Sequence, residues 1–382
     1  MSVAVGLACL AGVAPVLGQA PTPSSAPTGS PASLSTGSQV QALSSPPGVS
    51  IASGAGPGAK GWDGIAAYRF PLGSRGTRGA VAASHHHYGL GRALARSGAQ
   101  GQVDALGAAV DVPLTTTGNG RLSWQIGVEL RRMGHAPNTS KASTMSNASN
   151  ASNASNASNA SYARKAMAFT DSRRAVAVTT GLQAAMVPSA GSAAWGGVWM
   201  EVGDVRLRDA AAAVADAASA RSAGEYLLLS SDLALLKQWN AWGLLLRGSG
   251  QIANKNLDAS KKFPLGGAHG VRAWPLGEAS GDHGVLAQME LRYRWKALEP
   301  FGFVDAGRVR FSHTPWETSA RARVLPQGRT LAGAGVGLRW QHGPWSADGA
   351  AGWRLGTAMH RRSLSAPKAR MPQLWVSVAY AL

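Results

Sequence analysis

Few residues in the sequence could support catalysis or bind a metal, and none has the neighbours that such chemistry needs. Three consecutive histidines occupy residues 85–87, but the alternation of a predicted strand would place them on opposite faces. Ser249 lies between two glycines without the strand-to-helix turn that exposes a nucleophilic serine. Glycines alternate over residues 333–337, but no helix follows to bind a phosphate, so we expect them to let another segment lie close. We therefore predict no enzyme activity, no metal and no cofactor.

The most distinctive stretch is FPLGGAHGVRAWPLGEASGD, residues 263–282, in which five glycines and two prolines surround one arginine. Its residues of interest are Val271, Arg272, Ala273 and Trp274, together with the glycines Gly266, Gly267 and Gly270. The whole connection, residues 254–284, is about twice as long as the roughly 12–15 residues beyond which structureless loops are uncommon unless functional. The sequence therefore predicts a segment that is either disordered or functional.

The charge of the chain first suggests a nucleic-acid partner. The chain has 382 residues with 37 Lys and Arg against 19 Asp and Glu, which gives a net charge of +18. Nucleic-acid binding needs basic residues clustered on one face or in a known motif, whereas these arginines are scattered along the chain. The 48 glycines, 13 tryptophans and only 15% charged residues are instead typical of short, tightly turned strands with aromatic ends. We therefore predict no nucleic-acid partner.

Outside the glycine-rich stretch, the sequence alternates with a period of two. Over residues 284–295, one face carries Val285, Ala287, Met289, Leu291, Tyr293 and Trp295, and the other carries Gln288, Glu290, Arg292 and Arg294. The same division recurs over residues 121–131 and 345–355. Segments of about ten residues with an apolar face, a polar face and terminal aromatic residues are typical of transmembrane β-barrels. A soluble β-sandwich also alternates, but its strands need no such aromatic ends.

Counting these segments predicts about thirteen strands, joined by connections that alternate between short and long. The predicted strands cover residues 62–70, 79–88, 101–113, 121–133, 173–187, 193–203, 223–236, 241–253, 284–295, 299–310, 329–340, 345–355 and 371–382. An Ala-rich run at residues 210–218 predicts a short helix in one long connection. In outer-membrane barrels the short turns face the periplasm and the long loops face outward. We therefore predict an all-β fold, a transmembrane antiparallel β-barrel domain over residues 61–382.

Three segments lack the alternation. Residues 1–20 form an apolar run that ends in small residues and resembles an export signal peptide, without a basic start. Residues 21–60 are rich in Pro, Ser, Ala and Gly, which predicts a linker. Residues 134–172 contain a repeated Asn-Ala-Ser triplet that has no apolar residues to bury. We expect this last segment to be an extracellular loop that tolerates insertion.

Three motifs resemble those of one known family in order and spacing. They are Phe263-Pro264-Leu265-Gly266-Gly267, Val271-Arg272-Ala273-Trp274 and Phe303-Val304-Asp305-Ala306-Gly307. The chain is similar there to the outer-membrane transporters of two-partner secretion, the haemolysin secretion/activation and filamentous-haemagglutinin transporter family. The resemblance is densest over residues 250–353 and extends more weakly from residue 62 to the end.

The resemblance implies an outer-membrane location in a Gram-negative bacterium and a barrel of the sixteen-strand type. It implies that the long loop folds into the barrel lumen and that Arg272 meets Asp305, on the same strand as Gly307. A carboxylate facing lipid would be costly, which also favours a lumenal Asp305. At about 4 Å, the two charges gain roughly 4 kcal/mol at an effective dielectric of about 20, before desolvation.

The implied partners are a secreted exoprotein of the haemolysin or filamentous-haemagglutinin type, outer-membrane lipid and the barrel-assembly machinery. The expected function is a pore that passes this exoprotein outward without ATP. Such barrels favour a C-terminal phenylalanine, where this chain ends in Leu382 with Tyr380 on the apolar parity.

Two departures from the family leave alternatives open. Residues 1–60 are too short and too simple to supply the two periplasmic POTRA domains and three further strands, so we expect the 382-residue chain alone not to export a partner. The missing strands could come from residues 21–60 or from a second chain, or the barrel could fail to insert. A truncated relative that acts as a passive pore or an inactive remnant is the second hypothesis. A soluble β-protein that binds anionic polymers is the third.

Overall fold

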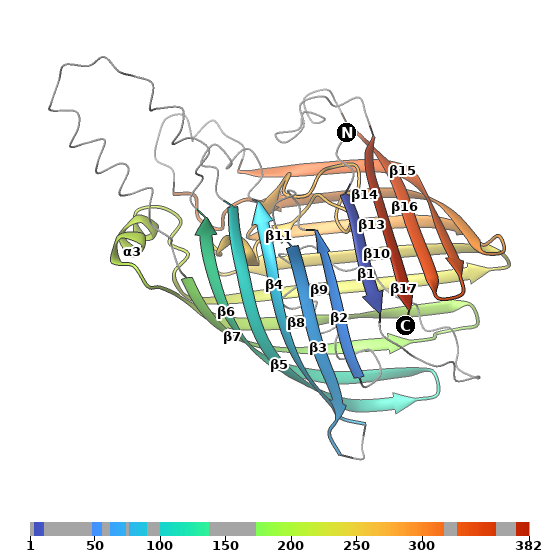
Figure 1. Cartoon of the computed structure of the whole chain (residues 1–382), viewed down its shortest axis with the longest axis horizontal. Coiled ribbons are helices and arrows are strands. Elements are labelled where there is room, and N and C mark those ends of the chain that lie inside the picture. Colours follow the sequence, from blue (N-terminus) through green and yellow to red (C-terminus); the bar gives the residue numbers. More distant parts are fainter. Residues whose placement is uncertain are drawn as a thin grey trace.

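The computed structural model describes residues 4–10, 48–55, 62–73, 76–89, 100–136, 173–316, 327–356 and 372–381. These residues form one sheet of 15 strands, in the order β1-β17-β16-β15-β14-β13-β10-β9-β8-β7-β6-β5-β4-β3-β2. The strands are β1 (Ala4–Leu10), β2 (Gly48–Ala55), β3 (Trp62–Pro71), β4 (Arg78–Gly89), β5 (Gln100–Thr117), β6 (Gly120–Ala136), β7 (Arg173–Met186), β8 (Ser192–Leu207), β9 (Gly224–Trp239), β10 (Trp242–Ala253), β13 (His283–Tyr293), β14 (Leu298–Arg310), β15 (Gly328–His342), β16 (Trp345–Arg354) and β17 (Gln373–Ala381). All the strands that the alternation predicts are present, and the sheet curves round into a barrel (Figure 1).

The two remaining strands of the barrel come from the first 60 residues. β2 pairs with β3 in antiparallel fashion, and β1 pairs with β17 in parallel. β1 also lies beside β2, so the two strands fill the gap between the first and last predicted strands (Figure 1). An odd number of strands requires one parallel pair, because every other neighbour alternates in direction. Residues 21–60, one of the sources that the sequence leaves open, supply β2, whereas β1 lies within residues 1–20, where the sequence predicts a signal peptide and no strand.

The faces of the strands are reversed relative to a soluble protein. On β6, the exposed side chains are Leu122, Trp124, Ile126, Val128 and Leu130, and the buried ones are Ser123, Gln125, Glu129 and Arg131. β13 shows the same arrangement, with Val285, Met289 and Leu291 exposed and Glu290 buried. Apolar side chains on the outside and polar ones inside are what a barrel in lipid requires. The predicted transmembrane β-barrel is therefore confirmed.

The connections alternate in length, so one end of the barrel carries tight turns and the other carries long loops. β9 and β10 are joined by a two-residue turn in which Asn240 has a φ of 54°, a left-handed conformation that asparagine tolerates. On the opposite end, helix α3 (Ala210–Ala217) lies between β8 and β9, capped by the Asp209 side chain, where the Ala-rich run predicts a helix. Among the residues that the structure describes, no helix is long and apolar enough to cross a membrane.

The connection between β10 and β13, residues 254–282, folds back into the barrel, and we call it the lumen loop. It contains the 3-10 helix η3 (Ala259–Lys261) and the two short strands β11 (Phe263–Pro264) and β12 (Ser280–Gly281), which pair with each other. Six of its side chains form the main hydrophobic core with side chains from the wall: Phe263, Leu265, Val271, Ala273, Trp274 and Ala279. The core of this protein therefore lies between the loop and the wall. The Asn-Ala-Ser segment lies outside the described residues.

Candidate functional site

The tip of the lumen loop is bound to the wall through Arg272. Its Nε donates to Asp305 Oδ2 at 2.8 Å and its Nη2 donates to Asp305 Oδ1 at 2.6 Å, a two-pronged arrangement of guanidinium and carboxylate. The backbone N–H of Arg272 also donates to Asp305 Oδ2 at 3.0 Å. Asp305, on β14, has no solvent-exposed surface. The structure thus brings together the arginine and the aspartate that the resemblance pairs.

A second carboxylate extends this contact along the wall. Arg272 Nη1 donates to Glu290 Oε1 on β13 at 2.9 Å, and the other oxygen of Glu290 accepts from Arg339 on β15 at 2.9 Å. Arg339 also binds Glu299 at 3.0 Å and Asp348 at 2.9 Å. We call the contacts of Arg272 with Asp305 and Glu290 the tip anchor. The resemblance pairs Arg272 with Asp305 only, and the alternation places Glu290 on the polar face of its strand without indicating its role.

Aromatic rings lie under both guanidinium groups. The Arg272 guanidinium carbon is 3.7 Å from the centre of the Phe303 ring, and that of Arg339 is 4.2 Å from the centre of Phe301. Cation–π contacts of this kind strengthen when water is excluded. Charge, hydrogen bonds and ring contacts therefore hold Arg272 in one position on the wall.

The residues beside Arg272 pack tightly against β15, β16 and β17. Trp274 is fully buried, and its Nε1 donates to the carbonyl of Ala332 at 3.0 Å. Ala273 lies against Gly333 and Gly352, where an added Cβ at Gly352 would be 2.9 Å from the Ala273 Cα. The ring nitrogen of Trp375 donates to the Arg272 carbonyl at 2.7 Å. Val271 is also fully buried, so all four residues of the motif 271–274 are buried inside the barrel, against its wall.

Close approach explains the glycines of the motif. Gly267 has a φ of 114°, a backbone conformation that favours glycine, and the backbone packs closely at Gly266 and Gly270. A Cβ at Gly307 of β14 would lie 2.5 Å from Leu265 Cδ1 of the loop. These four glycines allow the loop to turn sharply while it touches the wall.

The alternating glycines of β15 serve two different contacts. Gly333 receives Ala273 of the loop, since an added Cβ would overlap the Ala273 side chain. Gly335 and Gly337 instead receive the rings of Phe303 and Phe301, their register partners on β14. The expectation that these glycines accommodate another segment therefore applies to the loop at one position and to the neighbouring strand at the other two.

The base of the lumen loop is bound to the opposite part of the wall. Lys261 of η3 places its Nζ 2.5 Å from Glu201 Oε1 on β8 and 3.5 Å from Glu129 Oε1 on β6. Glu201 also accepts from the Tyr226 hydroxyl at 2.6 Å. We call the contacts of Lys261 with Glu201 and Glu129 the base anchor. All these side chains are buried.

Neighbouring contacts reinforce the base anchor. Arg131 of β6 is paired with Glu129, and its Nη1 donates to Ser260 Oγ of η3 at 3.2 Å. The alternation of the sequence does not identify these residues as contacts of the loop. Their signal is weak but visible: charged residues occur at polar-face positions of the predicted strands 121–133 and 193–203, and two lysines precede the glycine-rich motif.

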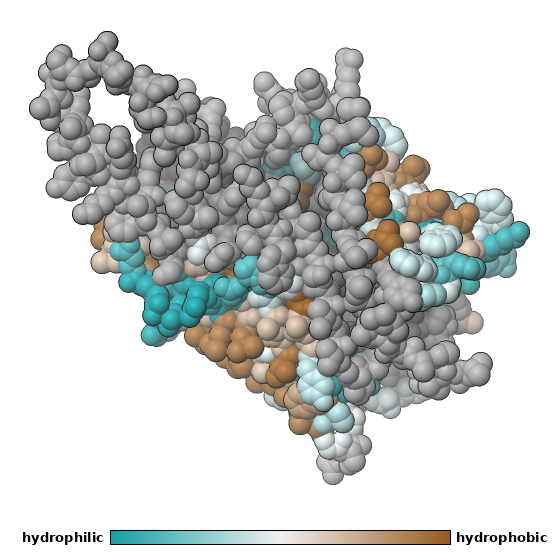
Figure 2. Space-filling view, viewed as in Figure 1, coloured by the Kyte–Doolittle hydropathy of each residue, from teal (hydrophilic) through white to brown (hydrophobic). Residues whose placement is uncertain are grey.

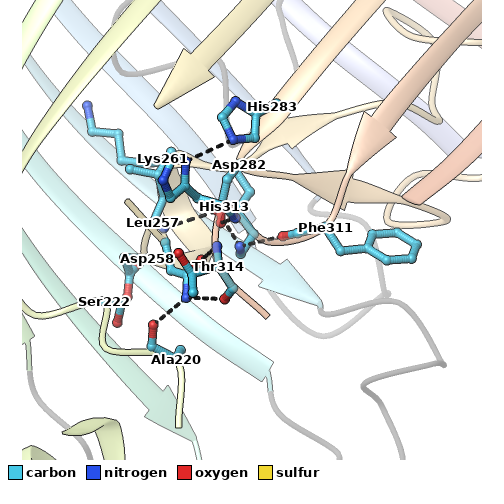
Figure 3. Close-up of polar contacts among 12 residues, drawn as sticks. Ala220, Ser222, Leu257, Asp258, Lys261, Asp282, His283, Phe311, His313 and Thr314 are labelled. Carbon is cyan, nitrogen blue, oxygen red and sulfur yellow. Dashed lines mark hydrogen bonds and ion pairs between the residues drawn. The ribbon is translucent and has the colours of Figure 1, made fainter. Parts of the chain in front are cut away.

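Asp282 connects the two ends of the lumen loop, which lie together and which we call the neck of the loop (Figure 3). Its side chain has no exposed surface, binds Lys262, and accepts from the backbone N–H of Leu257 at 3.0 Å and of His313 at 2.8 Å. Asp258 binds Arg173 of β7 at 2.8 Å. The loop is therefore held at its neck, its base and its tip.

Buried charges of this kind are stable only when they are paired and hydrogen-bonded. Removing both partners from water costs several kcal/mol per ion, so good geometry is needed to compensate. Arg272 meets this condition with three side-chain bonds to two carboxylates. Together, the anchors form an ionic attachment that holds the loop across the lumen and that water could replace.

The remaining predicted sites have simpler surroundings. His85 binds Asp104 at 2.5 Å, and the described residues contain no group of three or more side chains suited to a metal. Tyr380 lies on β17, where Trp345 of β16 is its register partner, and Leu382 lies outside the described residues.

A family model matches most of the chain. Residues 83–340 match the model described as haemolysin secretion/activation protein ShlB/FhaC/HecB. This range includes both anchors of the lumen loop. No curated protein matches the chain.

Solved structures resemble this fold at low sequence identity. CdiB from Escherichia coli aligns with a TM-score of 0.58 and 15% identity, over 86% of this chain and 54% of that one. CdiB from Acinetobacter baumannii gives a TM-score of 0.53 and 16% identity, over 86% of this chain and 50% of that one. BamA from Haemophilus ducreyi, lacking POTRA domains 1–3, gives 0.54 and 13%, over 83% and 62%. The chain thus spans about half the length of the CdiB structures. On the family match, supported by the barrel and its lumen loop, the chain belongs to the haemolysin secretion/activation protein family ShlB/FhaC/HecB.

Proposed function

We propose that this chain forms the pore of an outer-membrane transporter of two-partner secretion. Its substrate is a large exoprotein of the haemolysin or adhesin type, which crosses the lumen outward without nucleotide hydrolysis. The observation that carries the proposal is a loop anchored across the lumen of a lipid-facing barrel by Arg272 and Lys261. A barrel with only a structural role would not need a loop that is held in the lumen by ion pairs that water can replace.

The chemistry of the anchors suits a gate. The tip anchor and the base anchor are ion pairs, and both partners of each pair would regain hydration if the loop moved and water entered. The free energy of opening is therefore smaller than the strength of the individual contacts suggests. A partner can shift this equilibrium only by binding the open state more tightly than the closed state.

Insertion into the outer membrane follows from the exposed apolar band. Trp, Leu and Val side chains cover the outside of β6, β8 and β13, and tight turns occupy one end. We assign the tight-turn end to the periplasm and the long loops to the cell exterior. The cell's barrel-assembly machinery is the expected partner for insertion.

Export of a tagged exoprotein tests this function. Cells would express this chain and a tagged exoprotein of the haemolysin type from the same genome, together with a POTRA-containing fragment of a family member in trans. We expect the tag in the culture medium only when both the chain and the fragment are present. Retention of the exoprotein in the periplasm of cells with folded, inserted barrel would contradict the proposal and favour the passive pore.

A further inference from the structure

Three arginines lie side by side on the outer surface of adjacent strands, at the end of the barrel that carries the long loops. Arg132 of β6 is the register partner of Arg174 of β7, and Arg174 is the partner of Arg206 of β8. All three are exposed, and the Arg206 side chain retains 83% of its accessible surface. Their side chains lie on the outward-facing side of their strands, as do those of the apolar residues Leu130, Val176 and Val202.

This arrangement places like charges opposite one another. Neighbouring strands are about 4.8 Å apart, and like charges directly opposite across a strand pair are destabilising. Within the part of the chain that the structure describes, neither Arg132 nor Arg174 makes an ion pair. A bound anion between them would remove the repulsion.

The described acidic side chains near this row contact Arg206 or residues outside the row, and none makes an ion pair with Arg132 or Arg174. Asp204 binds Arg206 at 2.6 Å, and its register partner Glu225 lies one strand further on, away from β7. Asp104 is the register partner of Arg132, but its Oδ1 is 2.5 Å from His85 Nδ1. The positive charge is therefore least compensated between β6 and β7.

The depth of the row in the membrane indicates the kind of anion. From Leu122 to Arg132, the outward face of β6 spans ten residues, which at about 3.4 Å per residue and a tilt near 40° corresponds to about 25 Å along the membrane normal. That is the height of the apolar band of such barrels. Figure 2 shows a hydrophilic strip at the upper edge of the hydrophobic surface, near the ends of β6 and β7. The arginines therefore lie at the boundary between hydrocarbon and head groups.

We infer that Arg132, Arg174 and Arg206 form a binding site for a phosphorylated lipid head group of the outer leaflet. A guanidinium matches phosphate with two parallel hydrogen bonds, and long side chains at this depth reach naturally toward head groups. The adjacent apolar surface of β6 and β7 would contact the acyl chains of the same lipid. The inference rests on the membrane insertion and orientation proposed above.

Lipid titration of the purified chain tests this site. The folded chain in detergent would be titrated with bisphosphorylated lipid A while its thermal unfolding is followed, since a ligand of the folded state raises the unfolding midpoint. We expect the double variant Arg132→Gln/Arg174→Gln to lose about tenfold or more in apparent affinity. The matched control Arg294→Gln/Lys296→Gln removes two exposed charges at the tight-turn end and should bind like wild type.

The controls separate the possible outcomes. Equal affinity of the double variant and wild type would overturn the site. An equal response to dephosphorylated lipid A would show binding through acyl chains alone, and an equal response to inorganic phosphate would show an unspecific anion site; both contradict the inference. Heat-modifiable migration on gels, measured for every variant, distinguishes a chain that fails to fold as a barrel from a barrel that lacks the lipid site.

Discussion

At the scale of single residues, Arg272 links the loop to two strands at once. Its guanidinium bonds Asp305 and Glu290, and its backbone N–H bonds Asp305 as well. Removing one member of a buried ion pair leaves the other unpaired, which typically costs about 3–5 kcal/mol. Substitution of either partner is therefore costly, although the intact pair contributes less than this cost to the free energy of unfolding.

Substitution of either partner should loosen the loop. We expect Arg272→Ala and Asp305→Ala each to raise the ion conductance of the chain in planar lipid bilayers, because the remaining buried charge drives the loop toward water. A charge swap of the two residues should restore part of the closed state. Arg121→Gln is the matched control, because Arg121 binds Asp111 on the wall and no loop residue. Strictly additive effects of the two alanine substitutions would show that the residues act independently.

Removing the cation of the base anchor should also loosen the loop. We expect Lys261→Met to raise the conductance less than Arg272→Ala, since the tip stays bound and only the contacts of Lys261 with Glu201 and Glu129 are lost. The double variant should open the pore more than either single variant. Lys237→Met, at an exposed position near a tight turn, is the control. Unchanged conductance of the Lys261→Met variant would show that the base anchor does not hold the loop.

At the scale of elements, the loop and β15 fit together only because glycine leaves room. Ala273 occupies the space above Gly333, and the wall there offers no flexible side chain that could move aside. The sequence predicts the strands because alternation depends on local polarity, and it predicts that glycines admit another segment. It does not predict which glycine receives the loop, because that depends on the register between β14 and β15 and on the fold of the loop.

A side chain at Gly333 should displace the loop without changing any charge. We expect Gly333→Val to raise the conductance, because its Cβ would overlap Ala273. Gly302→Val is the matched control on β14, where the nearest atom to an added Cβ is 4.0 Å away. Equal conductance of the two variants, both folded by heat-modifiable migration, would count against tight packing of the loop at Gly333.

At the scale of the whole molecule, a barrel with polar side chains inside and apolar ones outside leaves the loop as its main internal core. Alternation predicts this architecture from the sequence, because the lipid and the wet lumen select opposite faces of every strand. It misses β1 and β2, whose short Ala- and Gly-containing segments show no clear division into two faces. The base anchor is missed for a related reason, since charged lumenal residues are expected everywhere and pair only through the fold.

The orientation of the barrel yields a topological prediction. The predicted loop 134–172 begins in the last residues of β6, at the end that carries the long loops, so we expect protease added to intact cells to cut within this segment. Western blotting of an epitope at the C-terminus would identify the fragment. Cutting only after cell lysis would reverse the assignment of the two ends.

Removing the inner part of the lumen loop shows whether this loop closes the pore. Leu265 N donates to the Ala279 carbonyl at 2.9 Å, so residues 266–278 can be replaced by two glycines while β11 and β12 stay paired. Single-channel conductance in planar bilayers would compare this variant with the intact chain at the same voltage and salt concentration. If the loop closes the pore, the variant with the shortened loop has a large, steady conductance and the intact chain a small one. Equal conductance of the two, with both barrels folded, would contradict closure by the loop.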